Sequence, residues 1–552
     1  MGKKKKKRDK MARMPTNRPT PIAIERVKVA NTGYSETGAS YKKGSLAAWH
    51  PIKSSPQSDI DANLGTLRGR SSDLYIGTPT ASAAINTSRT NIIGAGLRVA
   101  PRPAYKLLGI TAEEAEEWSR QVKAEFDLWA SSKECDIYGR DNFYDMQDIA
   151  YVSYAVDGDS FAIFKYRSAT PLMPYSLRIQ LLEAGRVSNP LSYGGDIGNI
   201  PGCVVVRNLK NGNRIVNGVE IDDDGKVVAY WISNKYAYDP SNMETIREWN
   251  RVQATGEKSG MPNILQICHD ERPEQYRGIP KLAPVIETLK QTGRYTNAEL
   301  TAAIIKSYFS MFVIENQEHA TKDVPIASLM NEMYQGKTKT EFDARNIVLG
   351  PGTINTLPPG YDLKSMDPQR SLSTFEPFMK ELTKQVGAAL GIPYEVLMKS
   401  FNSSYTASRA ALLQAWSEFK MRRTWFSRDF CQPVFEAWLT EAVVRGRVQA
   451  PQFFTDPIIR KAWCNAEWYG PTMGVLDPVK EAQSAQLRIL FGLSTREKEA
   501  AEMTGTSWDE NVERLAIENN RLREHGLPKY PAVQGSGADT TENTTNKEGN
   551  TT

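Results

Sequence analysis

Two stretches with helix-like spacing of apolar residues flank a short polar loop, KSFNSSYT, at residues 399–406. The first stretch covers residues 374–390 and ends at Gly391, with Pro393 close behind. Glycine just past a helix and proline beyond it stop helices, so we predict a helix end there. The loop has little apolar surface, and we expect it to lie in water or to line a wet space.

The second stretch begins near Ala407, and four residues just before it can cap a helix: Asn402, Ser403, Ser404 and Thr406. Its apolar residues recur at roughly helical spacing, which predicts one buried stripe: Leu412, Leu413, Trp416, Phe419 and Phe426. Proline lacks the N–H that a helix interior needs, so Pro433 is expected to break or kink this long helix.

Residues 66–280 alternate between helix-like and strand-like patterns, which predicts an α+β unit. We expect helices over 67–101 (ending at Gly94 or Gly96), over 111–130 with Thr111 as its cap, and over 142–156. We expect strands over 161–166, 177–182 and 264–269, and a hairpin over 218–232 whose turn contains Asp224 and Gly225.

The rest of the chain has the pattern of long helices with one insertion. Residues 281–310 and 371–398 are helical in pattern, and the 311–370 module between them mixes strand-like residues (311–314 and 346–349) with turns. The long kinked helix belongs to 407–476. Capped helices follow over 477–530, with capping boxes starting at Ser494 and Ser507.

Both ends have compositions typical of disordered chain. Residues 1–65 form a basic arm, and 531–552 form a polar tail. The lysine run at 3–8 can contact nucleic acid or can simply be solvated, and the sequence leaves both interpretations open.

Composition changes this picture little. The chain has 552 residues, is 40% hydrophobic and carries a net charge of +5, too small at this length to argue for nucleic acid by itself. Five separated cysteines without a CxxC pair indicate a reducing compartment without a disulfide framework or zinc site. The longest apolar run is too short for a bilayer, so we expect no membrane span.

Signals for catalysis are weak. The sequence contains no GxxxxGK[ST], HExxH or GxSxG motif, and none of its four histidines neighbours a plausible nucleophile. We therefore predict no catalytic residue, no bound metal and no cofactor. A pair of catalytic carboxylates stays possible, because one sequence does not reveal such a pair.

Positive charge is concentrated around the polar loop. Residues 399–447 hold eight basic and four acidic residues, and further basic residues lie on the helices upstream. These side chains can face nucleic acid or form ion pairs between subunits: Lys290, Arg294, Lys306, Lys380, Lys384, Arg409, Lys420, Arg422 and Arg423.

Eight short motifs, in order along residues 70–525, resemble those of lambda-type bacteriophage portal proteins. They are LLEAGRVSNP (181–190), GVEIDDDGKVVAYWI (218–232), ERPEQYRGIP (271–280), LGPGT (349–353), LPPG (357–360), GIPYEVL (391–397), SYTASRAAL (404–412) and DPVKEA (477–482). Each motif is weak alone, but their number and order make the resemblance specific.

The resemblance implies an α+β portal fold: an α/β wing at 66–280, stem helices at 281–310 and 371–398, a small α/β clip at 311–370 and a helical crown at 477–530. It also implies a homododecameric ring at one capsid vertex of the virion, assembled in the host cytoplasm. Double-stranded DNA would pass through that ring during packaging and ejection. Implied protein partners are the large terminase, the major capsid or scaffold protein, and a head-completion or tail connector protein.

By the same resemblance, the loop 399–406 is the tunnel loop, and Lys399, Asn402, Ser403, Ser404 and Tyr405 face the DNA channel. A polar loop with one cation suits a weak contact that is blind to base sequence. Neutralising Arg422 and Arg423 together is expected to impair assembly or packaging. Two alternatives stay open: a minor virion structural protein without a DNA channel, and a metal-dependent DNA-processing enzyme.

Overall fold

The computed structural model describes residues 39–40, 43–190, 205–208, 210–237, 247–308, 312–315, 361–364, 375–401, 404–473 and 478–527. The chain divides into two compact units, Met1–Ser55 and Pro56–Thr552. In the first unit, residues 43–49 form tight turns, in which the N–H groups of Leu46 and Ala47 both donate to the Lys43 carbonyl at 2.9 Å. Most of the expected arm and all of the expected 531–552 tail lie outside the described residues.

The second unit begins in helical structure, upstream of the expected boundary at residue 66. A π-helical turn, Gln57–Asp61, precedes α1 (Leu64–Gly77) and α2 (Pro79–Ile92). The prediction of a single helix over 67–101 is therefore wrong, but its predicted end is confirmed, because α2 ends at Ile92 and Gly94 follows in left-handed backbone at φ +60°. Thr78 is extended because a proline disfavours helical backbone in the residue before it, and Pro79 then starts α2. β1 (Arg98–Pro101) follows and pairs antiparallel with the distant β12 (Ala466–Tyr469).

Helix α5 (Phe143–Asp157) covers one face of a three-stranded sheet, and Trp129 at the end of α4 (Ala112–Ala130) donates to the Leu177 carbonyl at 3.3 Å. The short helix α3 (Tyr105–Leu108) packs instead against the later helix α12 (Pro457–Trp463). A reciprocal pair of hydrogen bonds between Thr111 and Glu114 confirms the predicted cap of α4. The antiparallel sheet has the order β3-β2-β9, from β2 (Asp159–Tyr166), β3 (Leu177–Glu183) and β9 (Ile264–Cys268). All three strands confirm predicted ones.

A second, five-stranded antiparallel sheet packs against the other face of β2. It is a meander of β4 (Val205–Arg207), β5 (Arg214–Val216), β6 (Val219–Ile221), β7 (Val227–Ser233) and β8 (Trp249–Gln253). The predicted hairpin is β6–β7, and Gly225 takes the left-handed backbone of its turn at φ +86°. Side chains alternate along β2: Phe161 and Ile163 pack with the second sheet, whereas Ala162 and Phe164 pack with the helices.

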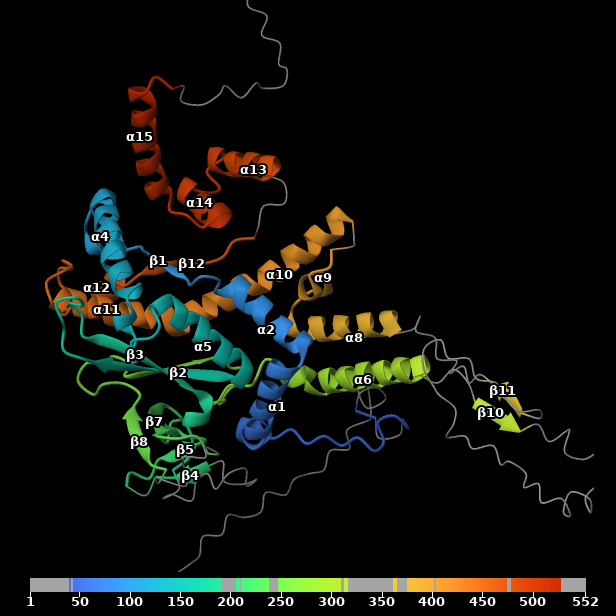
Figure 1. The fold of residues 1–552 in the computed structure, drawn as a ribbon. Helices are drawn as coiled ribbons and strands as arrows, with labels where there is room; N and C mark the ends of the chain where they lie inside the picture. Colours follow the sequence, from blue (N-terminus) through green and yellow to red (C-terminus); the bar gives the residue numbers. More distant parts are fainter. Residues whose placement is uncertain are drawn as a thin grey trace, which may run out of the picture. The chain divides into compact units, whose positions relative to one another are not determined.

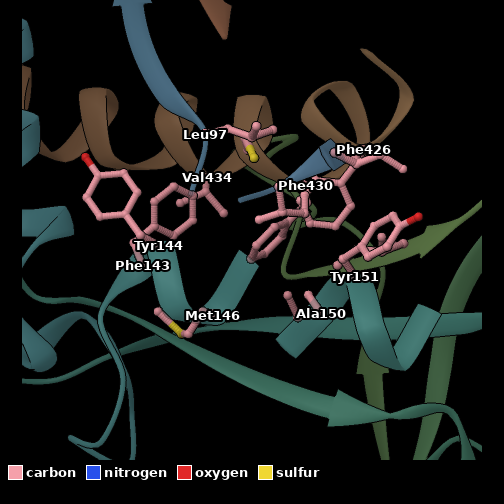
Figure 2. Packing of buried hydrophobic residues seen from close by; sticks show 14 of the residues in the cluster. Leu97, Phe143, Tyr144, Met146, Ala150, Tyr151, Phe426, Phe430 and Val434 are labelled. Atoms are coloured by element: carbon pink, nitrogen blue, oxygen red, sulfur yellow. The ribbon is translucent and has the colours of Figure 1, made fainter. Parts of the chain in front are cut away.

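The main core lies between α5 and a long helical rod from the C-terminal half (Figure 2). That rod consists of α10 (Tyr405–Phe426), a π-helical segment (Ser427–Cys431) and α11 (Gln432–Val444). Phe143 and Tyr151 of α5 face Phe430 and Phe426 of the rod, with ring centroids 5.6 and 5.9 Å apart. Pro433 does not break the rod: the π-helical segment directly precedes α11, and Pro433 lies in the first turn of α11, where its missing N–H is tolerated.

A fully buried arginine joins the two sheets. The Nε of Arg277 donates to Asp159 Oδ2 at 2.6 Å, and its Nη atoms donate to backbone carbonyls of Ala184, Val187 and Asn217. Arg68 of α1 donates to the other Asp159 oxygen at 2.8 Å. Burial alone would raise the pKa of Asp159, but these two guanidinium groups hold it below its ordinary value.

Two helices leave this body side by side, α6 (Ile286–Tyr308) and α8 (Phe375–Leu390) (Figure 1). A 3₁₀ turn, Ala283–Val285, precedes α6. Within the 311–370 module, the described residues form the antiparallel pair β10 (Phe312–Glu315) and β11 (Tyr361–Lys364). β10 confirms the strand predicted at 311–314, and the one expected at 346–349 lies outside the described residues.

The C-terminal part is helical, as predicted. After α12 (Pro457–Trp463) and β12 come α13 (Pro478–Leu490), α14 (Arg496–Thr504) and α15 (Trp508–Glu524). The cap of α14 is Thr495, which accepts from Lys498 N, so the capping box at Ser494 is wrong; Ser507 occupies the cap position of α15 without a side-chain capping bond. Ion pairs from Lys123 and Arg120 of α4 reach Glu510 and Glu513 of α15 at 2.5 and 3.4 Å.

The described helices and sheets confirm a mixed α+β architecture. None of the helices in these ranges is both long and apolar enough to cross a membrane.

Candidate nucleic-acid interface

The approach to the polar loop is a tight helix stop. Gly391 adopts φ +71°, and the Ile392 N–H donates back to the Gly387 carbonyl at 2.8 Å. A Cβ at Gly391 would also lie 3.1 Å from the Glu418 side chain of α10. These contacts confirm the predicted end of the helix. Glycine is favoured there for two reasons: the backbone is left-handed, and a side chain would crowd Glu418.

A short helix, α9 (Tyr394–Met398), lies between the stop and the loop. The range 371–398 is therefore two helices rather than one, because Gly391 and Pro393 interrupt it. Lys399 ends α9 in left-handed backbone at φ +53° and is exposed, and the Ser400 N–H donates to the Glu395 carbonyl at 3.0 Å.

The loop is shorter than expected. Ser404 caps α10 by accepting from Ala407 N at 3.4 Å, so the helix starts at Tyr405 and the predicted range 399–406 is too long. The hydroxyl of Ser404 satisfies an N–H of the first turn, so Thr406 lies inside the helix rather than at its cap. Asn402 and Ser403 lie outside the described residues.

The buried stripe of α10 is narrower than predicted. Trp416, Phe419 and Phe426 are buried and Leu412 is half-buried, but Leu413 is 51% exposed. Among the described residues, α10 packs against α2 and α9, and this packing leaves Leu413 exposed. Figure 1 shows this end of α10 beside α9 and away from the sheets.

Arg423 has its partners inside its own chain. Its Nε donates to the Ile92 carbonyl at 3.0 Å, and its Nη2 donates to the carbonyls of Asn91 and Pro471 at 2.8 and 2.7 Å. Burial lowers its pKa to about 10, so it stays charged at neutral pH. These contacts give Arg423 a role within its own chain, and its predicted contact with DNA or a neighbouring subunit stays a prediction.

Arg422 is also engaged within the chain. Its Nε donates to Glu418 Oε1 at 2.6 Å, one helical turn back, and only 21% of its side chain is exposed. Beside it, Lys281 donates to Ser88 Oγ at 2.9 Å, and burial together with the Arg422 charge lowers the Lys281 pKa to about 7. Sequence reasoning missed Lys281, because nothing local marks a lysine that tertiary packing buries.

The other candidate cations lie on exposed or half-buried surface. Three form ion pairs: Lys290 with Asp73 at 3.6 Å, Lys384 with Glu381 at 3.2 Å and Lys420 with Glu502 at 3.7 Å. Lys380 lies 5.6 Å from the centre of the Tyr394 ring, Arg294 is exposed, and Arg409 is half-buried. Lys306 belongs to α6, and its side chain lies outside the described set. Exposed ion pairs are weak, so these side chains can still meet a polyanion.

Within the described ranges, no group of three His, Cys, Asp or Glu side chains is arranged to hold a metal ion. Of the loop between α9 and α10, the described residues Lys399, Phe401 and Ser404 are exposed, and Lys399 is the one cation among them.

Comparison with known proteins defines the class as phage portal proteins. The family described as phage portal protein, lambda family, matches residues 42–423. Portal protein B of Escherichia phage lambda is 27% identical over 512 residues, covering 91% of each chain. The portal protein of Escherichia phage N15 is 26% identical over 517 residues, covering 90% of this chain and 91% of its own.

The chain belongs to the lambda family of phage portal proteins. It is also similar to a solved chain from the virion of a native gene transfer agent particle, at 14% identity and a TM-score of 0.39, over 87% of this chain and 95% of that one.

Proposed function

We propose that this protein forms a ring of about twelve copies at one vertex of a bacteriophage capsid and conducts double-stranded DNA during packaging and ejection. The observation that carries the proposal is the lambda-family match over residues 42–423, together with similarity to portal protein B along 91% of both chains. Similarity over almost the whole length favours a shared overall role rather than one shared domain.

The expected subdomains are assigned to the observed elements as part of this proposal. The two packed sheets with α1–α5 are the wing, α6 and α8 are the stem, and α13–α15 are the crown. The 311–370 module is the clip, to which we assign docking of the large terminase and later of a head-completion or tail connector protein. The ring would assemble in the host cytoplasm with the major capsid or scaffold protein and remain in the virion.

The loop between α9 and α10 is the proposed contact to moving DNA. Every fixed phosphate contact adds salt-dependent affinity and therefore resistance to sliding. An exposed loop with the single cation Lys399 and the polar Ser404 at its end supports a weak, sequence-independent contact. Arg422 and Arg423 donate within the chain, so the proposed contact is assigned to the loop rather than to them.

Electron microscopy of the purified protein, with its mass from light scattering, tests the proposal. Rings of about twelve subunits with an axial hole are expected. A protein that stays monomeric at high concentration with scaffold protein present would instead favour a minor virion protein. Metal-dependent cleavage of DNA by the purified chain would favour the enzyme alternative.

A further inference from the structure

The connection between β2 and β3 presents an unusually exposed leucine on a rigid support. Leu172 is 94% exposed, and the backbones of Thr170 and Met173 exchange hydrogen bonds of 2.9 and 3.1 Å around it. Pro171 and Pro174 stand on either side of Leu172 and Met173 and restrict the backbone further. The leucine is therefore held out into solvent by a tight turn rather than by a loose loop.

The base of this hairpin tip is anchored in the core. Met173 and Tyr175 are buried, and the Tyr175 hydroxyl donates to Glu125 of α4 at 2.8 Å. Glu441 of α11 accepts from the backbone N–H groups of Ser176 and Leu177 at 2.5 and 2.9 Å. Because the tip is already ordered, binding would cost less conformational entropy than it costs a flexible loop.

The opposite end of the same strands opens into a groove. This hollow has a volume of about 1020 Å³ and is bordered by α1, α5, the end of β3 and the residues after β7. Apolar side chains with large exposed fractions line it: Ile76 (83%), Tyr138 (59%), Ile149 (44%) and Tyr236 (40%). A monomeric soluble protein rarely leaves such side chains together in a hollow without a partner.

Charge makes the tip and the groove complementary. The tip carries two exposed cations, Lys165 and Arg167, and residues 165–176 contain no acid. In the groove, Arg68 and Arg89 are paired with Asp159 and Asp148. Asp136, Asp141, Asp157 and Glu183 also line it, against Arg140 and Arg186. Without the fully buried Asp159, the groove lining holds five carboxyl groups and four guanidinium groups, a surplus of one carboxyl, whereas the tip has a surplus of two cations.

Topology prevents the tip from reaching the groove of its own chain. Ser160 lines the groove and pairs with Glu183, whereas Tyr166 pairs with Leu177 at the tip end of the same two strands. Six residue steps along a strand separate the two ends by about 20 Å. A tip and a groove at opposite ends of one rigid element describe a head-to-tail contact, which repeats from copy to copy.

We propose that the β2–β3 tip, led by Leu172, inserts into the groove beside Ile149 of a second copy of this chain. The inference rests on the proposed ring and deepens it by naming one contact between its neighbours. It does not need the ring to close, since the same contact repeated without closure would give a filament.

Disulfide trapping tests the contact directly in the full-length chain. The double variant Leu172→Cys/Ile149→Cys is expected to give a ladder of cross-linked multimers on a non-reducing gel after mild oxidation. The matched control is Leu128→Cys/Ile149→Cys, because Leu128 is 70% exposed on α4 and does not belong to the tip. A ladder no stronger than in that control would overturn the inference.

A mixing experiment tests the head-to-tail geometry. Leu172→Glu and Ile149→Glu should each raise the concentration needed for half-maximal association about tenfold or more. Their one-to-one mixture should form capped pairs, because one intact tip and one intact groove remain. Leu128→Glu should associate like the unchanged chain. Normal association of Leu172→Glu would refute the contact.

The outcomes separate this inference from the proposed function. Rings seen by electron microscopy without a cysteine ladder would leave the portal function standing and remove this interface. A cysteine ladder together with open filaments and no rings would support this interface and count against the proposed portal ring. If Leu172→Glu lowers the melting temperature of the monomer, its weaker association can reflect a damaged fold. In that case the cysteine cross-linking experiment decides whether the contact exists.

Discussion

Arg423 lies on α10, yet all its observed hydrogen bonds go to backbone carbonyls of Asn91, Ile92 and Pro471. Those carbonyls end α2 and follow β12, so one guanidinium ties three distant parts of the chain together. A charged donor shared among half-buried acceptors contributes to folding.

We expect Arg423→Ala to lower the free energy of unfolding by about 2–3 kcal/mol, because it removes a charged donor from three carbonyls. The measurement is urea unfolding of the purified chain. Lys420→Ala is the matched control on the same helix, and its exposed ion pair with Glu502 should be worth less than about 0.5 kcal/mol. Unchanged stability in Arg423→Ala, with DNA packaging abolished, would return Arg423 to the candidate interface.

A cluster of carboxyl groups around Arg68 and Arg277 makes stability depend on pH. Burial raises the pKa of Asp61 and of Asp157 to about 6, against an ordinary value of 3.8. A carboxyl whose pKa is higher in the folded chain binds protons better when folded. Its contribution is therefore fully present below about pH 3.8 and disappears as the pH rises through 6.

Asp61→Asn should remove part of this pH dependence. The variant is expected to be more stable than the unchanged chain at pH 8 by on the order of 1–2 kcal/mol and to show a flatter profile between about pH 5 and 7. Melting temperatures of the variant and the unchanged chain, measured across that pH range and at pH 8, test this expectation. Asp59→Asn, on the same turn but exposed, is the control. A variant less stable than the unchanged chain at pH 8 would show that charged Asp61 supports the fold.

At the turn from α5 into β2, the backbones of Gly158 and Gly278 lie in close contact. A Cβ on Gly278 would lie 1.8 Å from the Gly158 carbonyl oxygen, which is backbone and does not rotate away. Gly158 itself has φ +94°. This contact sets the distance between the end of α5 and the segment that carries Arg277.

Gly278→Ala is expected to cost several kcal/mol and to reduce the yield of folded protein sharply, since backbone must shift to relieve the clash. Gly293→Ala is the matched control. Gly293 lies within α6 with no atom near its added Cβ, so alanine there should be neutral or stabilising by up to about 1 kcal/mol. Thermal unfolding compares the two, and similar destabilisation in both would argue against the clash.

Local signals predict the elements well, whereas long-range contacts leave no such signal. The Thr111 cap, the Gly391 stop and the β6–β7 turn depend on residues within a few positions of one another. The pair Asp159–Arg277 joins residues 118 positions apart, so no local pattern announces it. Pro79 marks the break at Thr78, but the continuous apolar spacing around it favours a single helix.

The candidate site shows the same division. The polar loop and its Ser404 cap are visible in the sequence, but the partners of Arg422 and Arg423 are not, because burial of a cation depends on packing from α2 and α5. Basic residues on a helix are therefore a poor guide to which side chains can face DNA.

At the scale of the whole molecule, the proposed channel makes one electrostatic prediction. Lys399→Gln should weaken DNA binding by the assembled protein and lower the slope of log affinity against log salt by about one for each phosphate that the lysine neutralises. Assembly should not change. Lys461→Gln, an exposed lysine of α12, is the control. Equal salt dependence in all three proteins would exclude Lys399 from the DNA interface.

The rod of α10, the π-helical segment and α11 runs unbroken from the loop to the core. At about 1.5 Å per residue its 405–444 length is about 60 Å. Its root is fixed by aromatic packing against α5, while Leu413 in its first turns is 51% exposed. Mechanically this is a cantilever. A sideways push at the loop bends the free end and leaves the anchored end in place, whereas a push along the axis loads the aromatic core directly.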